Sequence, residues 1–290
     1  MSEIPVAPRP AGTGGRPPPT TRARALAPRA ALGIAAALGV MALSLAACGS
    51  SRVSLTGEVR YGKTAEEDYQ AGEEELKDKN FAEATKFFEH VRNKYPFSRY
   101  AALAELRLAD TKLAQGKYAE AAEAYLQFVK LHPSHDQDDY AAFRAGLAHF
   151  RDAPTDFFLF PPTYEKDQTQ VRDAAKALDD FVKGYPASKY RPEAQKLLAE
   201  ANARLAEHEW YAAQFYAKRG YPAGAAGRLE TMVKDYPTSP RAGAALFQLA
   251  EIYIKMDERF RAQQKLQELI VKHPQDPRRA DAEKLLASLR

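Results

Sequence analysis

The hydrophobic pattern between residues 94 and 135 predicts one pair of α-helices. In the first, from Ser98 to Gln115, leucines recur close to the spacing of three or four residues that places side chains on one helix face: Leu103, Leu106, Leu108 and Leu113. Gly116 then supplies the left-handed conformation that ends a helix. The second helix runs from Tyr118 to Leu131 and ends before Pro133. Together they form an αα-hairpin.

The same pattern recurs five times. The closing prolines are Pro96, Pro133, Pro186, Pro237 and Pro274. Twelve residues before each proline stands an alanine: Ala84, Ala121, Ala174, Ala225 and Ala262. Eight before stand Phe88, Tyr125, Leu178, Leu229 and Leu266, and five before stand Val91, Phe128, Phe181, Met232 and Leu269. An alanine lets two helices approach closely, and bulky residues fill the groove toward the next hairpin. The sequence therefore predicts an all-α solenoid of five hairpins.

The four spacings between these prolines indicate the class of repeat and show which units are irregular. The spacings are 37, 53, 51 and 37 residues, so the regular unit is slightly longer than the tetratricopeptide repeat of about 34 residues. Gly116-x-Tyr118-x-x-Ala121 is similar to the motif of that repeat class. In the third hairpin, residues 153–167 separate the first helix from a second that begins after Gln168. In the fourth, a long first helix spans residues 189–219.

Polar residues mark where several helices begin. Thr64 and Glu67 form a capping box for the first helix. Ser239-Pro240 is a cap followed by proline at the first helical position, and Asp276-Pro277 repeats this device. The last helix then runs to Leu289, and we expect it to cover the open groove of the fifth hairpin as a C-terminal capping helix.

The amino-terminal residues have the pattern of an export signal. Residues 1–21 lack an apolar period and indicate either a disordered extension or a start codon assigned too early. After them, basic residues precede the uncharged run of residues 30–47 and then Cys48. A membrane-spanning anchor is the alternative, because 18 residues approach the roughly 20 needed to cross a bilayer. The chain's one cysteine stands where a lipoprotein signal peptidase would cut. We therefore expect a signal peptide over 1–47, a lipidated tether over 48–63 that begins at Cys48, and the solenoid over 64–290.

Net charge gives no sign of a nucleic-acid partner. The full chain carries 42 basic and 38 acidic residues, and residues 1–47 hold five arginines and one glutamate. The remaining chain therefore has 37 residues of each sign and is neutral, with no basic stripe.

The sequence offers little chemistry. His132 and His135 form an H-x-x-H pair, but His132 occupies a pre-proline position where other repeats have tyrosine, and no third ligand has a usable spacing. We expect no metal, no cofactor and no catalytic residue. A repeat scaffold offers a binding surface instead.

Several motifs together resemble one lipoprotein family. They are Tyr95-Pro-Phe-Ser-x-Tyr100, Tyr140-x-x-Phe-Arg-x-Gly-Leu147, Asp156-Phe-Phe158 with Asp167 and Arg172, and Phe215-Tyr-x-x-Arg-Gly220. With the leader, they resemble the BamD family of the outer-membrane β-barrel assembly machinery, from about Thr64 to Pro274. Phe160-Pro161-Pro162 departs from the usual loop of that family.

The resemblance implies an outer-membrane lipoprotein that faces the periplasm. Such an adaptor binds the POTRA region of a BamA-like barrel subunit, works with other lipoproteins of the machinery and helps unfolded barrel precursors to fold. Other helical-repeat lipoproteins, such as a pilotin for a pilus secretin or a coordinator of cell-wall synthesis, are the alternatives.

Two sets of site residues follow from this resemblance. The expected contacts with the barrel subunit are Tyr216, Arg219 and Arg228. Since Arg228 follows Ala225 by three residues, both arginines should lie near one edge of the fourth hairpin. The expected contacts with precursors are Tyr69, Tyr100 and Tyr140, on the first helices of repeats one to three.

Overall fold

The structure is a computed structural model, and it describes residues 59–155 and 162–289. The chain divides into two units, residues 1–51 and 52–290, and the description concerns the second. The predicted signal peptide and the lipidation at Cys48 lie outside the described residues.

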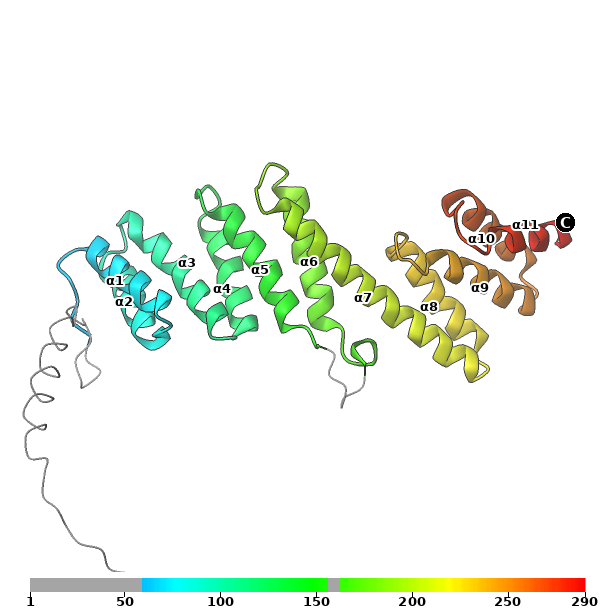
Figure 1. The fold of residues 1–290 in the computed structure, drawn as a ribbon, viewed down its shortest axis with the longest axis horizontal. Coiled ribbons are helices and arrows are strands. Elements are labelled where there is room, and N and C mark those ends of the chain that lie inside the picture. The colour runs from blue at the N-terminus through cyan, green and yellow to red at the C-terminus, as the bar shows by residue number, and fades with distance from the viewer. Residues whose placement is uncertain (1–58, 156–161, 290) are drawn as a thin grey trace, which may run out of the picture. The chain divides into compact units, whose positions relative to one another are not determined.

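All regular elements of the described residues are helical, and successive helices pack as hairpins (Figure 1). The α-helices are α1 (Ala65–Lys77), α2 (Phe81–Lys94), α3 (Arg99–Ala114), α4 (Tyr118–Leu131), α5 (Asp138–Asp152), α6 (Thr169–Gly184), α7 (Arg191–Lys218), α8 (Pro222–Asp235), α9 (Ala242–Lys255), α10 (Arg259–Lys272) and α11 (Arg279–Ser288). Each packs mainly against its neighbours in the chain, and the pairs α1–α2, α3–α4, α5–α6, α7–α8 and α9–α10 are the five hairpins. The predicted all-α solenoid is confirmed.

The three columns of repeated residues form the core. All fifteen side chains of these columns are at most 2 % exposed, and all five alanines are completely buried. The core is accordingly a series of clusters between adjacent helices, as expected for repeats that contact only their neighbours. Burial of the columns explains why the hairpins form where the spacing predicts.

The predicted ends of helices are largely confirmed. Gly116 and Gly220 adopt φ values of +76° and +75° after α3 and α7. The Thr64 hydroxyl accepts a hydrogen bond from the Glu67 amide at 3.2 Å. The Glu67 carboxylate, however, accepts from the Lys63 amide at 2.8 Å, one residue before the expected donor.

Two helices begin later than predicted. Ser239 accepts a hydrogen bond from the Arg241 amide at 3.3 Å, and α9 starts only at Ala242, so Pro240 lies in the turn before the helix. Likewise, Asp276 accepts from the Arg278 amide at 2.8 Å before α11 begins. In both places a turn precedes the helix, because the amide of the third residue after Ser239 or Asp276 donates to its carbonyl.

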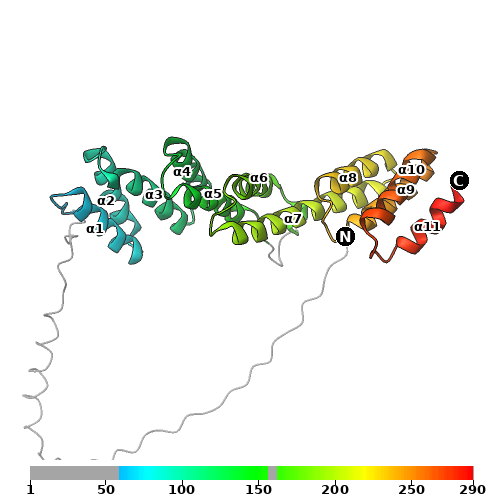
Figure 2. The ribbon, with the colours of Figure 1, turned by 90° about the horizontal axis from the view of Figure 1, so that it is seen from above.

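The two long repeats meet around α7. A 3₁₀ turn, η1 (Thr163–Glu165), precedes α6 and is held against α7, where the His208 Nδ1 atom lies 2.7 Å from the Tyr164 carbonyl oxygen. The buried Gln168 side chain donates to the Thr163 carbonyl at 2.7 Å and thereby closes this turn. Helix α7 has 28 residues and reaches from α6 to α8 (Figure 2).

Within residues 59–155 and 162–289, none of the helices has both the length and the apolar character needed to cross a bilayer.

Candidate functional site

A buried carboxylate holds together side chains of repeats two and three. Asp110 of α3 is 9 % exposed. Its Oδ1 atom accepts hydrogen bonds from the hydroxyls of Tyr125 and Tyr140, the latter at 2.8 Å. Its Oδ2 atom accepts from Arg107 Nη1 at 2.6 Å. A buried charge requires such partners, so Asp110 fixes side chains from α3, α4 and α5 in one place.

Two arginines extend this network along the first helices. Arg107 also donates through Nε to Glu73 Oε1 of α1 at 2.6 Å. Arg144 of α5 donates through Nε to the Tyr125 hydroxyl at 3.4 Å, and its guanidinium lies 5.4 Å from the centre of the Tyr140 ring. Helices α1, α3 and α5 are therefore linked by a polar chain that we call the Asp110 network: Glu73, Arg107, Asp110, Tyr125, Tyr140 and Arg144.

The tyrosines of the network remain hydrogen-bond donors at ordinary pH. Burial raises the pKa of Tyr125, and the Asp110 carboxylate raises it further. The same two causes, in the same order, raise the pKa of Tyr140. Both hydroxyls are thus protonated and point their hydrogen atoms at Asp110.

The predicted precursor-binding tyrosines gather at this network. The rings of Tyr69 and Tyr100 lie 5.3 Å apart. Burial raises the pKa of Tyr69, and Arg107 and Glu73 both lie close enough to its hydroxyl to shift this pKa, Arg107 downward and Glu73 upward. Tyr140 lies on the other side, with its ring 5.7 Å from that of Tyr190. These aromatic rings therefore flank the network from α1 to the residue that precedes α7.

A pocket of about 640 Å³ opens beside the Asp110 network. Its lining residues come from α1, the α1–α2 turn, α2, α3 and α5: Glu73, Leu76, Lys77, Lys79, Phe81, Arg107, Asp110, Ala114 and Arg144. Four of these side chains are cationic and two are anionic. The pocket therefore joins a net positive rim to the apolar surface of Leu76 and Phe81.

Sequence reasoning missed Arg107, Asp110 and Arg144. One signal could have indicated them: Tyr125 is the only residue of its column that carries a polar atom. A buried hydroxyl needs a partner, and Asp110 lies on the neighbouring helix of the same hairpin.

The predicted contacts with the barrel subunit lie where α7 meets α8. The Tyr216 ring packs so closely on Gly224 that a Cβ atom there would be 3.0 Å from Tyr216 Cδ1. Arg228 donates to Glu209, with distances of 3.2 and 3.4 Å to its two carboxylate oxygens. Burial alone would lower the pKa of Arg228, but Glu209 and Tyr216 raise it. The structure therefore joins Tyr216 and Arg228 through contacts within the hairpin.

Arg219 has different surroundings. It is exposed, and its guanidinium lies 4.2 Å from the centre of the Phe215 ring, which is 42 % exposed. Phe215 and Glu209 were not predicted as site residues. Arg219 and Phe215 are thus exposed at this edge, whereas Tyr216 and Arg228 are half-buried and held by contacts within the hairpin.

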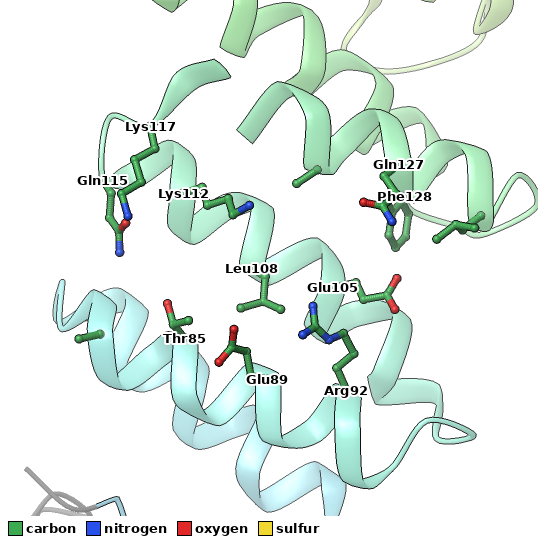
Figure 3. Close-up of a pocket in the computed structure, with 13 residues that line it drawn as sticks. Thr85, Glu89, Arg92, Glu105, Leu108, Lys112, Gln115, Lys117, Gln127 and Phe128 are labelled. Carbon is green, nitrogen blue, oxygen red and sulfur yellow. The ribbon is translucent and has the colours of Figure 1, made fainter. Parts of the chain in front are cut away.

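A second pocket lies between α2 and α4 with α3 as its floor (Figure 3). It has a volume of about 510 Å³. Leu108 and Phe128 supply apolar surface, while Glu89, Arg92 and Lys112 bring both signs of charge. It contains none of the predicted site residues, and its mixed charges indicate no particular ligand.

The histidine pair is part of a helix end. His132 Nε2 lies 2.8 Å from Glu105 Oε2, and its ring lies 4.9 Å from that of Phe128. The ring of His135 accepts a hydrogen bond from the Gln137 amide at 3.1 Å. Among the residues that the structure describes, no group of three His, Cys, Asp or Glu side chains is placed to hold a metal ion.

Five stacked hairpins with exposed polar and aromatic edges define a protein of the helical-repeat binding class. Comparison with known families identifies the family within this class. The model of the YfiO family, described as outer membrane lipoprotein, matches residues 62–269. The chain belongs to this family of outer membrane lipoproteins.

Its relatives include several proteins named outer membrane protein assembly factor BamD. That of Neisseria meningitidis serogroup B is 26 % identical over 221 residues, which cover 75 % of this chain and 83 % of the relative. That of Caulobacter vibrioides is 28 % identical over 228 residues, covering 78 % and 70 % of the two chains. The resemblance inferred from the motifs is confirmed.

Among solved structures, the TPR2AB domain of yeast Sti1 is 15 % identical, covers 78 % of this chain and 86 % of that chain, and has a TM-score of 0.36. A TM-score this low adds nothing to the fold, which rests on the hairpins themselves.

Proposed function

We propose that this chain takes part in the assembly of β-barrel proteins into the outer membrane, as a periplasmic adaptor held at that membrane by lipid on Cys48. The observation that carries the proposal is the family match over residues 62–269, together with relatives named as outer membrane protein assembly factors. The leader and the lone cysteine support the anchor. In this role the chain binds a BamA-like barrel subunit, other lipoproteins of the machinery and unfolded precursors.

The Asp110 network is the proposed site for precursors. An extended chain that carries aromatic side chains can stack on tyrosines, and Tyr69, Tyr100 and Tyr140 supply rings along consecutive first helices. Arg107 and Arg144 supply donors for its carbonyl or carboxylate groups. Asp110 holds Tyr140 and Arg107 in place before binding, and such preorganisation lowers the cost of binding.

The edge of α7 and α8 is the proposed contact with the POTRA region of the barrel subunit. Aromatic and arginine side chains are the usual anchors of protein interfaces, and Arg219 on Phe215 presents both to solvent. Arg228 stays available to a partner in part, since its side chain is 42 % exposed.

The Glu209 pair decides which substitution tests this edge. Arg228→Glu would place a second carboxylate beside the buried Glu209 and disturb the hairpin itself. Arg219→Glu is therefore the cleaner change. It should weaken binding to the purified POTRA region by about 2 kcal/mol or more without lowering the melting temperature, whereas Lys176→Glu, on α6, is the matched control and should leave binding unchanged. Equal binding by wild type and Arg219→Glu removes Arg219 from the interface.

Depletion tests the function as a whole. When the chain is depleted from its host, folded barrel proteins in the outer membrane should decrease and unfolded precursors should accumulate in the periplasm.

Photo-crosslinkers placed beside Tyr69 and Tyr140 should capture carboxy-terminal peptides of precursors. Labelling confined to α8–α10 would exclude the Asp110 network as the precursor site.

A further inference from the structure

Residues 61–63, which lie just before the Thr64 cap of α1, are fixed to the first hairpin, in part by a buried carboxylate. The Gly62 amide donates to Asp68 Oδ1 at 2.6 Å, and His90 Nδ1 lies 2.8 Å from Asp68 Oδ2. The Asp68 side chain is completely buried, so these two contacts hold a charged group that water does not reach. Asp68 thereby ties the segment before α1 to both helices of the hairpin.

Aromatic contacts close the same segment over α2. The Tyr61 ring stacks on the His90 ring at 3.8 Å between centroids and 17° between planes, and it meets the Phe87 ring edge-on at 5.8 Å. Phe87 is completely buried although it does not belong to the core column of the repeat. The Tyr95 hydroxyl donates to the Lys63 carbonyl at 3.4 Å and holds the other end of the segment.

The backbone at Gly62 fits this arrangement only without a side chain. A Cβ atom there would lie 2.7 Å from Glu67 Cβ and 3.3 Å from Asp68 Oδ1. Real Cβ atoms do not approach another atom as closely as the first distance, so a larger residue would lift the segment off α1. Glycine thus permits the hydrogen bond to Asp68.

We propose that residues 61–63 form a strap that caps the amino-terminal end of the solenoid and fixes where the chain leaves it toward Cys48. End repeats of a solenoid need a cover for their open side, and Tyr61 provides it for Phe87. The anchoring role rests on the proposed lipidation, whereas the strap itself does not. If Cys48 is held at the membrane, release of the strap frees three further residues, which adds about 10 Å to the reach of the tether.

Amide hydrogen exchange of the full chain, with Cys48→Ser to leave it unlipidated, tests the strap. In the otherwise unchanged chain, the Gly62 amide should exchange at least about tenfold more slowly than in an unstructured peptide. Gly62→Ala should abolish this protection while α3 to α11 keep theirs. Gly227→Ala is the matched control, because a Cβ atom at Gly227 meets nothing within 4 Å.

Tyr61→Ala separates release of the strap from damage to the hairpin, because it changes no residue of α1 or α2. It should raise exchange at Gly62 and also broaden the distance distribution between spin labels on Arg60→Cys and Lys117→Cys. The strap proposal would be refuted if the Gly62 amide were unprotected in the chain that carries Cys48→Ser alone. It would also be refuted if protection at position 62 were unchanged in both Gly62→Ala and Tyr61→Ala. Failure of lipidation at Cys48 would leave all these results as they are and would affect the anchoring role alone.

Discussion

The hydroxyl of Tyr125 is the most informative single group to remove from the Asp110 network. Tyr125→Phe keeps the ring that fills the core column, and Phe88 shows that phenylalanine fits the equivalent place in the first repeat. What is lost is the donor to Asp110 and the acceptor of the Arg144 Nε hydrogen. Any loss of stability therefore reports hydrogen bonding and not packing.

The expected cost follows from these contacts. A hydrogen bond to a charged group contributes about 1.5–3 kcal/mol. Asp110 retains Tyr140 and Arg107 as partners, which keeps its charge compensated, so we expect about 2 kcal/mol. For a chain of this size, that corresponds to a fall of roughly 4–8 °C in the melting temperature.

Thermal melts followed by far-ultraviolet circular dichroism measure this fall. Tyr118→Phe makes the same chemical change in the same helix, at a half-buried tyrosine whose hydroxyl has no hydrogen bond among the described residues, and should shift the melting temperature by less than about 2 °C. A double-mutant cycle of Tyr125→Phe with Asp110→Asn should give a coupling free energy above about 0.5 kcal/mol. Equal melting temperatures for Tyr125→Phe and Tyr118→Phe, or full additivity in the cycle, would refute the reasoning.

Three further predictions concern helix packing, pH dependence and lipidation. Ala121→Leu should overpack the second hairpin and cost about 1–3 kcal/mol, while Ala119→Leu on the exposed side should cost little, and equal melts of the two variants would place the column wrongly. Burial and nearby carboxylates raise the pKa of Tyr125 and of Tyr185, the latter to about 12. Because tyrosine ionises near pH 10 in the unfolded chain, the unfolded state loses protons first and stability should fall as pH rises above about 10; a constant melting temperature up to about pH 11 would contradict this. Cys48→Ser should leave an unprocessed or soluble precursor by mass spectrometry, and an unlipidated mature wild type would end the lipoprotein hypothesis.

The hairpins were predictable because their contacts repeat locally in the chain. The two helices of each hairpin pack on each other, and the alanine of each column position is completely buried, so the spacing from one proline to the next already reflects the packing. The place of Pro240 was predicted wrongly, since a cap residue signals that a helix is near but not how many residues of turn precede it. The domain boundaries and the roles of the site residues stay predictions.

The Asp110 network and the Glu209 pair were not predictable in the same way. Asp110 meets Tyr140 across 30 positions, and Arg228 meets Glu209 across 19 positions, on helices whose relative rotation the apolar pattern does not fix. Charged residues on a helix usually belong to its solvated face. Only the packed structure shows that these two carboxylates are buried and that arginines compensate them.

Affinity purification of the native chain from outer membranes in mild detergent, with the bound proteins identified by mass spectrometry, tests the proposed role most directly. A barrel-forming subunit with POTRA domains should be recovered in near-stoichiometric amount, together with lipoproteins of the assembly machinery, and Arg219→Glu should reduce its recovery. Recovery of a pilus secretin or a cell-wall synthase in place of the barrel subunit would contradict the assignment.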